Sequence, residues 1–124
     1  MDLKRGDIIS LKDVTYDLGK NVQAKKRLYV VISNNKNNKK APIINIASLS
    51  TRTQKSYYPM HVELNKNNYK CFRRDNIILV EQVLTVNKDK VKEKVTTLNE
   101  KDLNKLNKAI VIQMIDETGN AILV

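Results

Sequence analysis

Apolar residues gather in short runs along the first two thirds of the chain, and this pattern predicts β-strands. Leu28–Ile32 and Ile43–Leu49 are rich in β-branched side chains, and they flank Asn34–Lys40, which contains only asparagine and lysine. Runs of this kind, bounded by polar residues, are typical of core strands. The pattern therefore predicts two paired central strands joined by a solvated basic loop.

Three more runs predict further strands. Ile8–Leu11 follows a turn, and Tyr57–Leu64 alternates apolar with polar residues, as a half-buried strand does. Pro59 has no backbone N–H, so we expect it at the start of that strand or on a sheet edge. Ile77–Val86 is apolar almost throughout, which predicts a central strand buried on both faces.

The clearest prediction is a helix near the C-terminus. Asn99 is a good N-cap, and Asp102 has the position from which a side chain returns a hydrogen bond to the N–H of the cap residue. Leu98 and Leu103 have the spacing of a hydrophobic staple. The helix is expected to end before Gly119. Its apolar face would carry Leu103, Leu106, Ile110 and Met114, and its polar face Lys101, Asn104, Lys105 and Lys108.

The remaining segments are polar connections. Lys12–Lys26 and Asn65–Arg74 are irregular, and Val91 and Val95 indicate one further short element after a turn. Loops longer than about 12 residues in compact domains are usually functional or disordered. The chain has no internal repeat, so residues 1–124 are expected to form one mainly β (α+β) domain. About six strands would form a small barrel or sandwich with a docked C-terminal helix.

The charge of the chain points to a polyanionic partner. Lysine and arginine number 23 against 13 aspartate and glutamate, which gives a formal charge of +10. Such an excess favours nucleic acid, because lysine and arginine replace the counterions of phosphates; a basic surface that serves only solubility is the alternative. No apolar run of membrane-spanning length and no hydrophobic signal core are present, so we expect no membrane association and a cytoplasmic location.

Several classes of catalytic site are disfavoured. Cys71 is the only cysteine, which excludes a disulfide within the chain, and beside Phe72 it is expected to be a packed side chain. His61 is the only histidine, so a two-histidine ribonuclease is excluded; it is either structural or an RNA contact. The carboxylates lack the clustering that holds a metal ion, and we expect no metal and no other cofactor.

Metal-free transesterification of RNA remains, because the 2′-hydroxyl of RNA can itself be the nucleophile. Such a site must position that hydroxyl and stabilise charge on the phosphoryl oxygens. Arg27 begins one central strand, and Ser50 and Thr51 end the other, so antiparallel pairing would bring them to one rim of the sheet. An arginine fork suits phosphoryl oxygens. By composition alone, an ordinary surface arginine is the favoured interpretation of Arg27, because charged residues usually lie on the surface.

Five motifs in register carry a family resemblance. They are RGDII at 5–9, VVISN at 30–34, the P-x-x-x-I-A-x-L-S/T stretch at 42–51, P-x-HVEL at 59–64 and I-L-x-EQ-x-x-T at 78–85. With these and the helix sequence LNEKDLNKLNKAI, the chain resembles the MazF/PemK toxin family over nearly its whole length.

The resemblance implies a fold and an activity. The fold would be a small Src-homology-3-like β-barrel of the Kid/MazF/CcdB type, usually a homodimer. The activity would be sequence-specific, metal-independent cleavage of single-stranded mRNA to 2′,3′-cyclic phosphate and 5′-hydroxyl ends. The chain would be the toxin of a bacterial type II toxin–antitoxin pair, blocked by a cognate antitoxin, with DNA binding a property of the toxin–antitoxin complex.

The resemblance also implies site residues. Arg27 matches the catalytic arginine, and Ser50, or Thr51 if the register shifts by one, matches the catalytic threonine. The expected RNA contacts are Gln23, Lys25, Lys26, His61 and Gln82. The chain departs from the family pattern in having Leu28 where proline is usual, serine at 50, Leu84 where arginine is common, and no glycines after Gln23.

Two other functions remain open from the sequence. The same fold serves a non-enzymatic gyrase poison that acts through the end of its C-terminal helix and does not need Arg27 or Ser50. A toxin homologue that binds RNA without cleaving it would retain the same positive charge.

Overall fold

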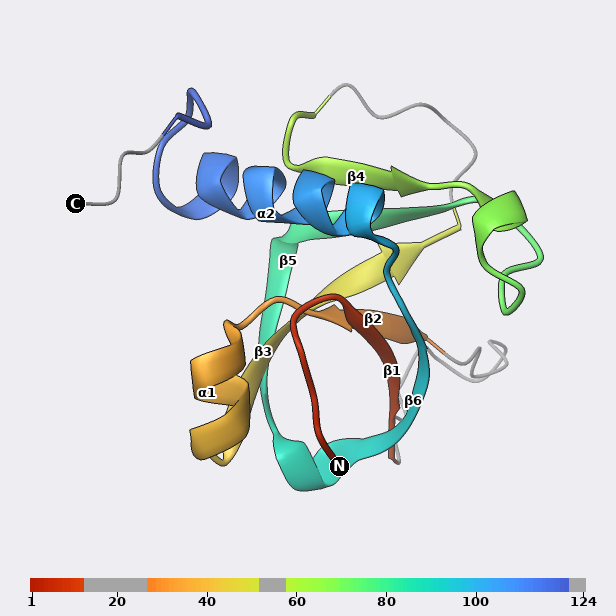
Figure 1. Cartoon of the computed structure of the whole chain (residues 1–124), viewed down its shortest axis with the longest axis vertical. Coiled ribbons are helices and arrows are strands. Elements are labelled where there is room, and N and C mark those ends of the chain that lie inside the picture. The colour runs from red at the N-terminus through yellow and green to blue at the C-terminus, as the bar shows by residue number, and fades with distance from the viewer. Residues whose placement is uncertain (13–26, 52–57, 121–124) are drawn as a thin grey trace, which may run out of the picture.

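One sheet of six antiparallel strands forms the body of the molecule. The computed structural model describes residues 1–12, 27–51 and 58–120, and the statements below concern these residues. The strand order is β4-β5-β3-β2-β1-β6 (Figure 1). The strands are Asp7–Leu11 (β1), Leu28–Val31 (β2), Ile43–Ser50 (β3), His61–Leu64 (β4), Asn76–Asn87 (β5) and Val91–Thr97 (β6); the α-helices are Asn35–Lys40 (α1) and Glu100–Met114 (α2).

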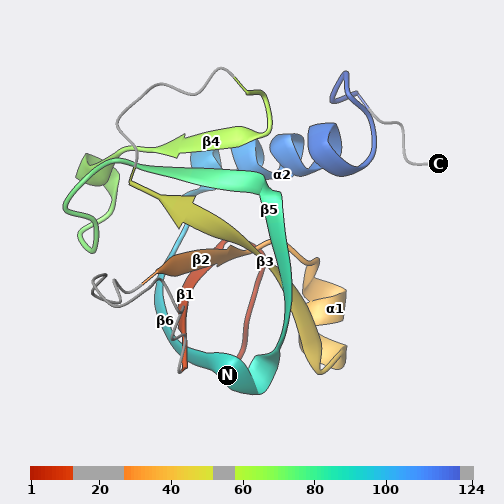
Figure 2. The same ribbon diagram turned by 180° about the vertical axis from the view of Figure 1, so that it is seen from behind.

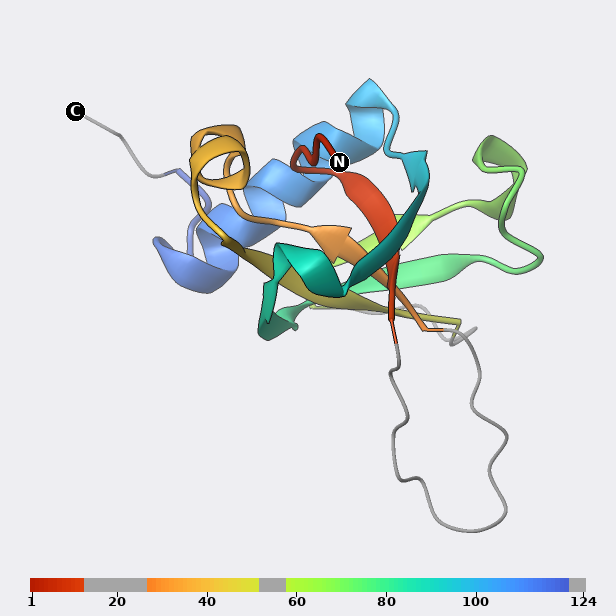
Figure 3. The ribbon, with the colours of Figure 1, turned by 90° about the horizontal axis from the view of Figure 1, so that it is seen from below.

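The mainly β fold with a C-terminal helix is confirmed, but a closed barrel is not. Within the described part of the chain, β4 and β6 lie at the two edges of the sheet and do not pair with each other. The sheet is instead open and strongly curled, and seen from below β1, β6 and the last part of β5 curve round its end (Figure 3).

Two clusters of buried side chains stabilise the sheet. The first lies between the sheet and α2, which contacts β4 and β5, and it includes Ile78, Val80 and Leu106 (Figure 2). The second joins Leu3 to side chains of β1, β2, β3 and β6 and includes Tyr29 and Ile46. No helix in the described residues is both long enough and apolar enough to cross a membrane.

β5 bends sharply in its middle. The β3–β5 register passes from Ala47↔Val83 directly to Ser48↔Leu79, so three consecutive β5 residues have no partner on β3. Such bulges bend a strand and redirect its side chains. The predicted burial on both faces is therefore right only for the first part of β5. Beyond the bend, Leu84 is 40% exposed.

The segment 34–40, predicted as a loop, forms the short helix α1. Asn34 is its N-cap, and the Asn34 Oδ1 accepts a hydrogen bond from the backbone N–H of Asn37 at 2.8 Å. Asn38 is buried, and its Nδ2 donates to the Ser33 carbonyl at 2.8 Å. The prediction failed because asparagine has a modest intrinsic helix propensity, whereas capping and this buried contact stabilise the turn in place.

Three consecutive residues at the start of β1 connect distant parts of the fold. The Arg5 Nε donates to the Ile32 carbonyl at 2.8 Å, and its Nη1 donates to Asn107 Oδ1 at 3.3 Å. Gly6 has φ +93°, and a Cβ there would lie 2.9 Å from Leu103 Cδ1. Asp7 is 1% exposed and ion-paired with Lys94 at 3.1 Å. The RGD part of the first motif therefore has structural contacts.

The predicted helix α2 is confirmed, with one correction to its cap. The Asn99 side chain accepts from the Asp102 N–H at 2.8 Å, as expected. The Asn99 N–H, however, donates to the Tyr69 hydroxyl at 3.1 Å, and that hydroxyl donates to Asp102 Oδ2 at 2.5 Å. Tyr69 is buried and so joins the connection before β5 to the start of α2; the sequence between Asn65 and Arg74 is not merely a polar connection.

Candidate functional site

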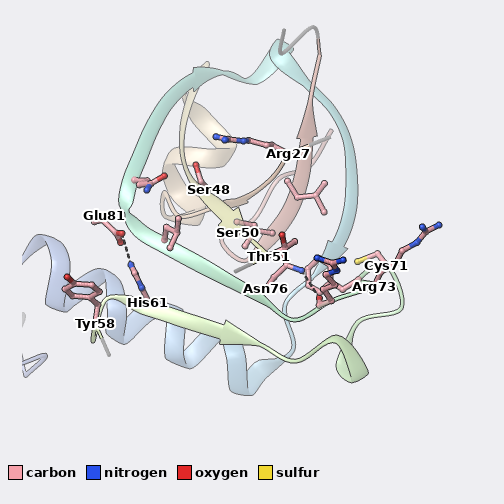
Figure 4. A pocket seen from close by; sticks show the side chains of 16 residues that line it. Arg27, Ser48, Ser50, Thr51, Tyr58, His61, Cys71, Arg73, Asn76 and Glu81 are labelled. Atoms are coloured by element: carbon pink, nitrogen blue, oxygen red, sulfur yellow. Dashed lines mark hydrogen bonds and ion pairs between the residues drawn. The ribbon is translucent and has the colours of Figure 1, made fainter. Parts of the chain in front are cut away.

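A cavity of about 760 Å³ opens over β3, β4 and β5, with α2 behind β4 in this view (Figure 4). Its walls come from the start of β2, the end of β3, both strands of the β4–β5 hairpin and the connection before β5. The lining residues are Arg27, Leu28, Ser48, Leu49, Ser50, Thr51, Tyr58, His61, Cys71, Phe72, Arg73, Arg74, Asn76, Leu79, Glu81 and Gln82.

The pairing of β2 with β3 brings Arg27 and Ser50 to the same end of the two strands. Tyr29 pairs with Ser48 and Val30 with Ala47, and Arg27 and Ser50 each lie two residues beyond the Tyr29–Ser48 pair. Both residues line the cavity. The predicted shared rim of an arginine and a hydroxyl is thus present in the fold, and neighbouring strands at this spacing lie about 4.8 Å apart.

A row of paired residues crosses the floor of the cavity. His61 on β4 pairs with Leu79 on β5, and Leu79 pairs with Ser48 on β3. Directly paired residues share one face of a sheet, so all three side chains face the cavity that they line. Ser48 is only 7% exposed. This buried hydroxyl next to the site was not predicted, although side chains alternate along a strand and Ser48 therefore shares a face with Ser50.

At one end of the cavity, a hydrogen-bonded histidine and glutamate lie beside an aromatic ring (Figure 4). His61 Nε2 lies 2.7 Å from Glu81 Oε1, and the ring of Tyr58 contacts that of His61 edge-on, with centroids 5.2 Å apart. The bend in β5 places Glu81 and its neighbour Gln82 at this end. We call these four residues, Tyr58, His61, Glu81 and Gln82, the tyrosine end.

The opposite end of the cavity is cationic. Arg73 lies with Thr51 and Asn76 (Figure 4), and Arg74, the next residue of the connection before β5, also lines the cavity; these four residues are the arginine end. Asn76 is 7% exposed, and its Nδ2 donates to the Arg74 carbonyl at 3.0 Å, which fixes the turn that carries the arginines. Two guanidinium groups beside a hydroxyl suit a phosphodiester backbone.

The cavity contains five of the eight residues predicted for the site. They are Arg27, Ser50, Thr51, His61 and Gln82, while Gln23, Lys25 and Lys26 lie outside the described residues. The sequence analysis did not predict Ser48, Tyr58, Glu81, Arg73 or Arg74 as site residues. Signals were available for four of these five: the adjacent arginine pair, the acidic residue within an apolar strand, and the spacing of Ser48 two residues from Ser50.

Two other sequence predictions concern metals and the cysteine. In the part of the chain that the structure describes, no three histidine, cysteine, aspartate or glutamate groups gather in a way that could hold a metal ion. Cys71 is exposed at the cavity, so the prediction that it packs in the interior is wrong. Its neighbour Phe72 is buried instead and contacts Tyr69.

Comparison with known proteins adds a sequence relationship to this geometry. Residues 4–114 match the model of a family described as PemK-like, MazF-like toxin of type II toxin–antitoxin system. The chain is also 37% identical over 112 residues to an endoribonuclease MazF of Staphylococcus saprophyticus. The aligned residues cover 90% of this chain and 91% of that protein.

Solved structures share the fold at low sequence identity. An endoribonuclease in complex with its cognate antitoxin from a mycobacterial species gives a TM-score of 0.69 at 17% identity, with 90% of this chain and 94% of that chain covered. A crystal structure of MazF from Deinococcus radiodurans gives 0.62 at 13% identity, with 90% and 94% covered. The similarity therefore extends along nearly the whole length of each protein.

Proposed function

Because the chain belongs to the family of PemK-like, MazF-like toxins of type II toxin–antitoxin systems, we propose that it is an endoribonuclease toxin. Its substrate is single-stranded RNA, with mRNA the expected class, and its place of action is the bacterial cytoplasm. The observation that carries the proposal is the position of Arg27 and Ser50 at the same end of β2 and β3, in a cavity with two more arginines.

The proposed reaction is an internal transesterification. The 2′-oxygen of a nucleotide attacks the adjacent phosphorus, the bond from phosphorus to the 5′-oxygen breaks, and the proton lost by the 2′-hydroxyl is balanced by one gained at the 5′-oxygen. The products are a 2′,3′-cyclic phosphate and a 5′-hydroxyl. Negative charge grows on the nonbridging oxygens, where the guanidinium of Arg27 is the natural partner.

Ser50 supports the same step from the opposite strand. Its hydroxyl can donate to the scissile phosphate and hold it while the 2′-oxygen approaches in line. Thr51 is the next hydroxyl along the chain and is exposed, so it is the second candidate for this role. Arg73 and Arg74 are proposed to bind the flanking phosphates, and Gln82 and His61 to contact the bases. No step in this scheme requires a metal ion.

The proposed partners are those of the family. A cognate antitoxin would inhibit the toxin by occupying the RNA cavity. One solved structure of the same fold is described as an endoribonuclease in complex with its cognate antitoxin. A homodimer is the expected assembly. The matched family is described as toxins of type II toxin–antitoxin systems and the curated relative as an endoribonuclease, and neither description supports the alternative of a gyrase poison.

Cleavage of a long, unstructured RNA in the presence of EDTA tests this function. The 5′ ends of the fragments would be sequenced, and their 3′ ends analysed for cyclic phosphate, with wild type and Arg27→Ala side by side. Wild type is expected to cut repeatedly at one short motif, and Arg27→Ala to lose activity by about 10²-fold or more.

Lys105→Ala is the matched control, because it removes one positive charge from the exposed side of α2, away from the cavity. It should cleave like wild type. Intact RNA with wild-type protein would contradict the enzyme, and a filter-binding assay on the same RNA would then show whether the chain binds RNA without cleaving it. Equal loss in Lys105→Ala and Arg27→Ala would reduce the role of Arg27 to net charge.

A further inference from the structure

Glu81 is an unexpected residue in a cavity for RNA. A carboxylate repels phosphate, yet Glu81 lines the same cavity as Arg27, Arg73 and Arg74. It stands at the bend of β5, where the register shift leaves it without a partner on β3. Its side chain is 35% exposed. Whatever binds at this end must therefore offer hydrogen-bond donors and not negative charge.

One carboxylate oxygen of Glu81 remains available to accept a hydrogen bond from a ligand. An ionised carboxylate only accepts hydrogen bonds, so the proton in the 2.7 Å contact comes from His61 Nε2 and points to Glu81 Oε1. Among the described residues, Glu81 has no other hydrogen bond or ion pair. The side chain of His61 is only 11% exposed, so it is a fixed support, and Glu81 Oε2 remains as an oriented acceptor in the cavity.

Tyr58 adds a surface on which a base can stack. It is 65% exposed although it is a large aromatic residue, and its ring meets the His61 ring edge-on at 5.2 Å. Unpaired bases in single-stranded RNA are commonly bound by stacking on aromatic rings and by hydrogen bonds to their Watson–Crick edges. An exposed ring and an oriented carboxylate oxygen side by side provide both contacts (Figure 4).

We propose that Tyr58, His61 and Glu81 form a base-reading subsite that selects a nucleobase with an exocyclic amine and rejects uracil. This inference rests on the proposed function and deepens it. Adenine, cytosine and guanine each present an N–H₂ group, which a glutamate can accept from. Uracil presents a single N–H between two carbonyl oxygens. Both carbonyl oxygens carry partial negative charge, so the carboxylate of Glu81 would repel them.

The structural alternative is that Glu81 serves only to hold His61. Glu81→Gln separates the two roles. Glutamine keeps a carbonyl oxygen that can accept from His61, but it replaces the second oxygen by an NH₂ group, which donates to a uracil carbonyl and opposes an incoming amine. A purely structural Glu81 would tolerate this exchange with no change in base preference.

The test is to cleave a pool of random-sequence RNA and to sequence the fragment ends. Wild type is expected to disfavour uracil at one fixed position relative to the cut. In Glu81→Gln, discrimination against uracil at that position should fall by about five- to a hundredfold, while preferences at other positions stay the same. An unchanged preference in Glu81→Gln would overturn the subsite and leave the proposed ribonuclease intact.

Glu63→Gln is the matched control, because it makes the same charge change on β4 at an exposed residue that does not line the cavity. Relaxed discrimination in this variant too would overturn the proposal in favour of a net-charge effect. Should wild type cleave nothing, the ribonuclease fails first, and the subsite is tested separately by binding of oligo(A), oligo(C) and oligo(U). Oligo(U) should then bind more weakly than the other two, and Glu81→Gln should remove the difference; equal binding by wild type would overturn the subsite.

Discussion

The two ends of one cavity have opposite electrostatic character. The arginine end presents two guanidinium groups beside a hydroxyl and an amide, whereas the tyrosine end presents a carboxylate, an imidazole, an amide and an exposed ring. Phosphates are alike in every nucleotide, so the first end can add affinity but not sequence information. Bases differ in their donors and acceptors, so the second end can discriminate. We therefore expect the arginine end to contribute affinity and the tyrosine end to contribute sequence specificity. Arg27 and Ser50 lie between the two ends in the view of Figure 4.

The largest effect is expected at the centre, where Ser50→Ala removes the proposed donor to the phosphate while both ends stay intact. The cleavage rate of bound RNA should fall by about 10²–10³-fold, because such a donor acts mainly in the transition state. Affinity should be nearly unchanged. Single-turnover kinetics with saturating protein, together with a separate binding assay, would measure both quantities.

Thr51→Ala distinguishes the two hydroxyls. A loss of less than tenfold is expected, since Thr51 is exposed beyond the end of β3. If Thr51→Ala instead caused the larger loss, the donor to the scissile phosphate would be Thr51 and not Ser50. The difference between the arginine end and the tyrosine end would be unaffected.

At the arginine end, the double variant Arg73→Ala/Arg74→Ala should weaken RNA binding by roughly tenfold or more at low salt. Each lost phosphate contact in single-stranded RNA changes the slope of log K against log salt by about 0.7, so the slope should become shallower by about 1.4. The motif that is cut should stay the same. Binding titrations at several salt concentrations and fragment-end sequencing would check the two halves of this prediction.

Lys105→Ala/Lys108→Ala is the corresponding control, because it removes two charges from the exposed side of α2. It should change the slope much less. A change of cut motif in the arginine variant would break the separation of affinity from specificity.

At the tyrosine end, Tyr58→Ala should weaken binding by about 1 kcal/mol, or about fivefold, which is the lower part of the range for stacking of a base on an aromatic ring. Tyr58→Phe keeps the ring and should bind like wild type. Fluorescence anisotropy with a short labelled RNA that carries the cut motif would resolve the difference. A loss in Tyr58→Phe equal to that in Tyr58→Ala would assign the contact to the hydroxyl and not to stacking.

The smallest effect on cleavage is expected from Tyr69→Phe, which removes a stabilising hydrogen bond outside the cavity. Burial and the hydrogen bond to Asp102 raise the pKa of Tyr69 to about 12, from an ordinary value of 10.0. Below about pH 10 both folded and unfolded states keep the proton, so the full stabilisation is present. Between about pH 10 and 12 the unfolded state loses its proton first, so the free energy of unfolding should fall as pH rises.

Tyr69→Phe should abolish this part of the alkaline destabilisation and lower stability at neutral pH by about 1–3 kcal/mol, because buried Asp102 loses its partner. Urea unfolding at neutral and alkaline pH would measure both effects, with RNA cleavage assayed in parallel at neutral pH. A large loss of cleavage in correctly folded Tyr69→Phe would show that the cavity depends on the start of α2.

Much of this molecule followed from the order of its residues. Continuous runs of β-branched side chains indicated β2 and β3, a capping asparagine indicated the start of α2, and five motifs in register indicated the family. The strands and the helix could be predicted because backbone propensity, capping and periodicity act within a few residues of the chain. The approach of Arg27 to Ser50 could also be foreseen, because antiparallel pairing of two neighbouring strands leaves little freedom in register.

Only the tertiary structure decided the rest. The bend in β5 depends on which β3 residue pairs with Leu79 and which with Val83, and no pattern within β5 itself specifies that choice. The His61–Glu81 contact joins two residues that are 20 positions apart in the sequence, and Tyr69 contacts the cap residue of a helix 30 positions further on. Such contacts depend on side-chain packing between separate elements. Sequence periodicity indicates which face of a strand is apolar, but it does not indicate which residues of other elements pack against that face.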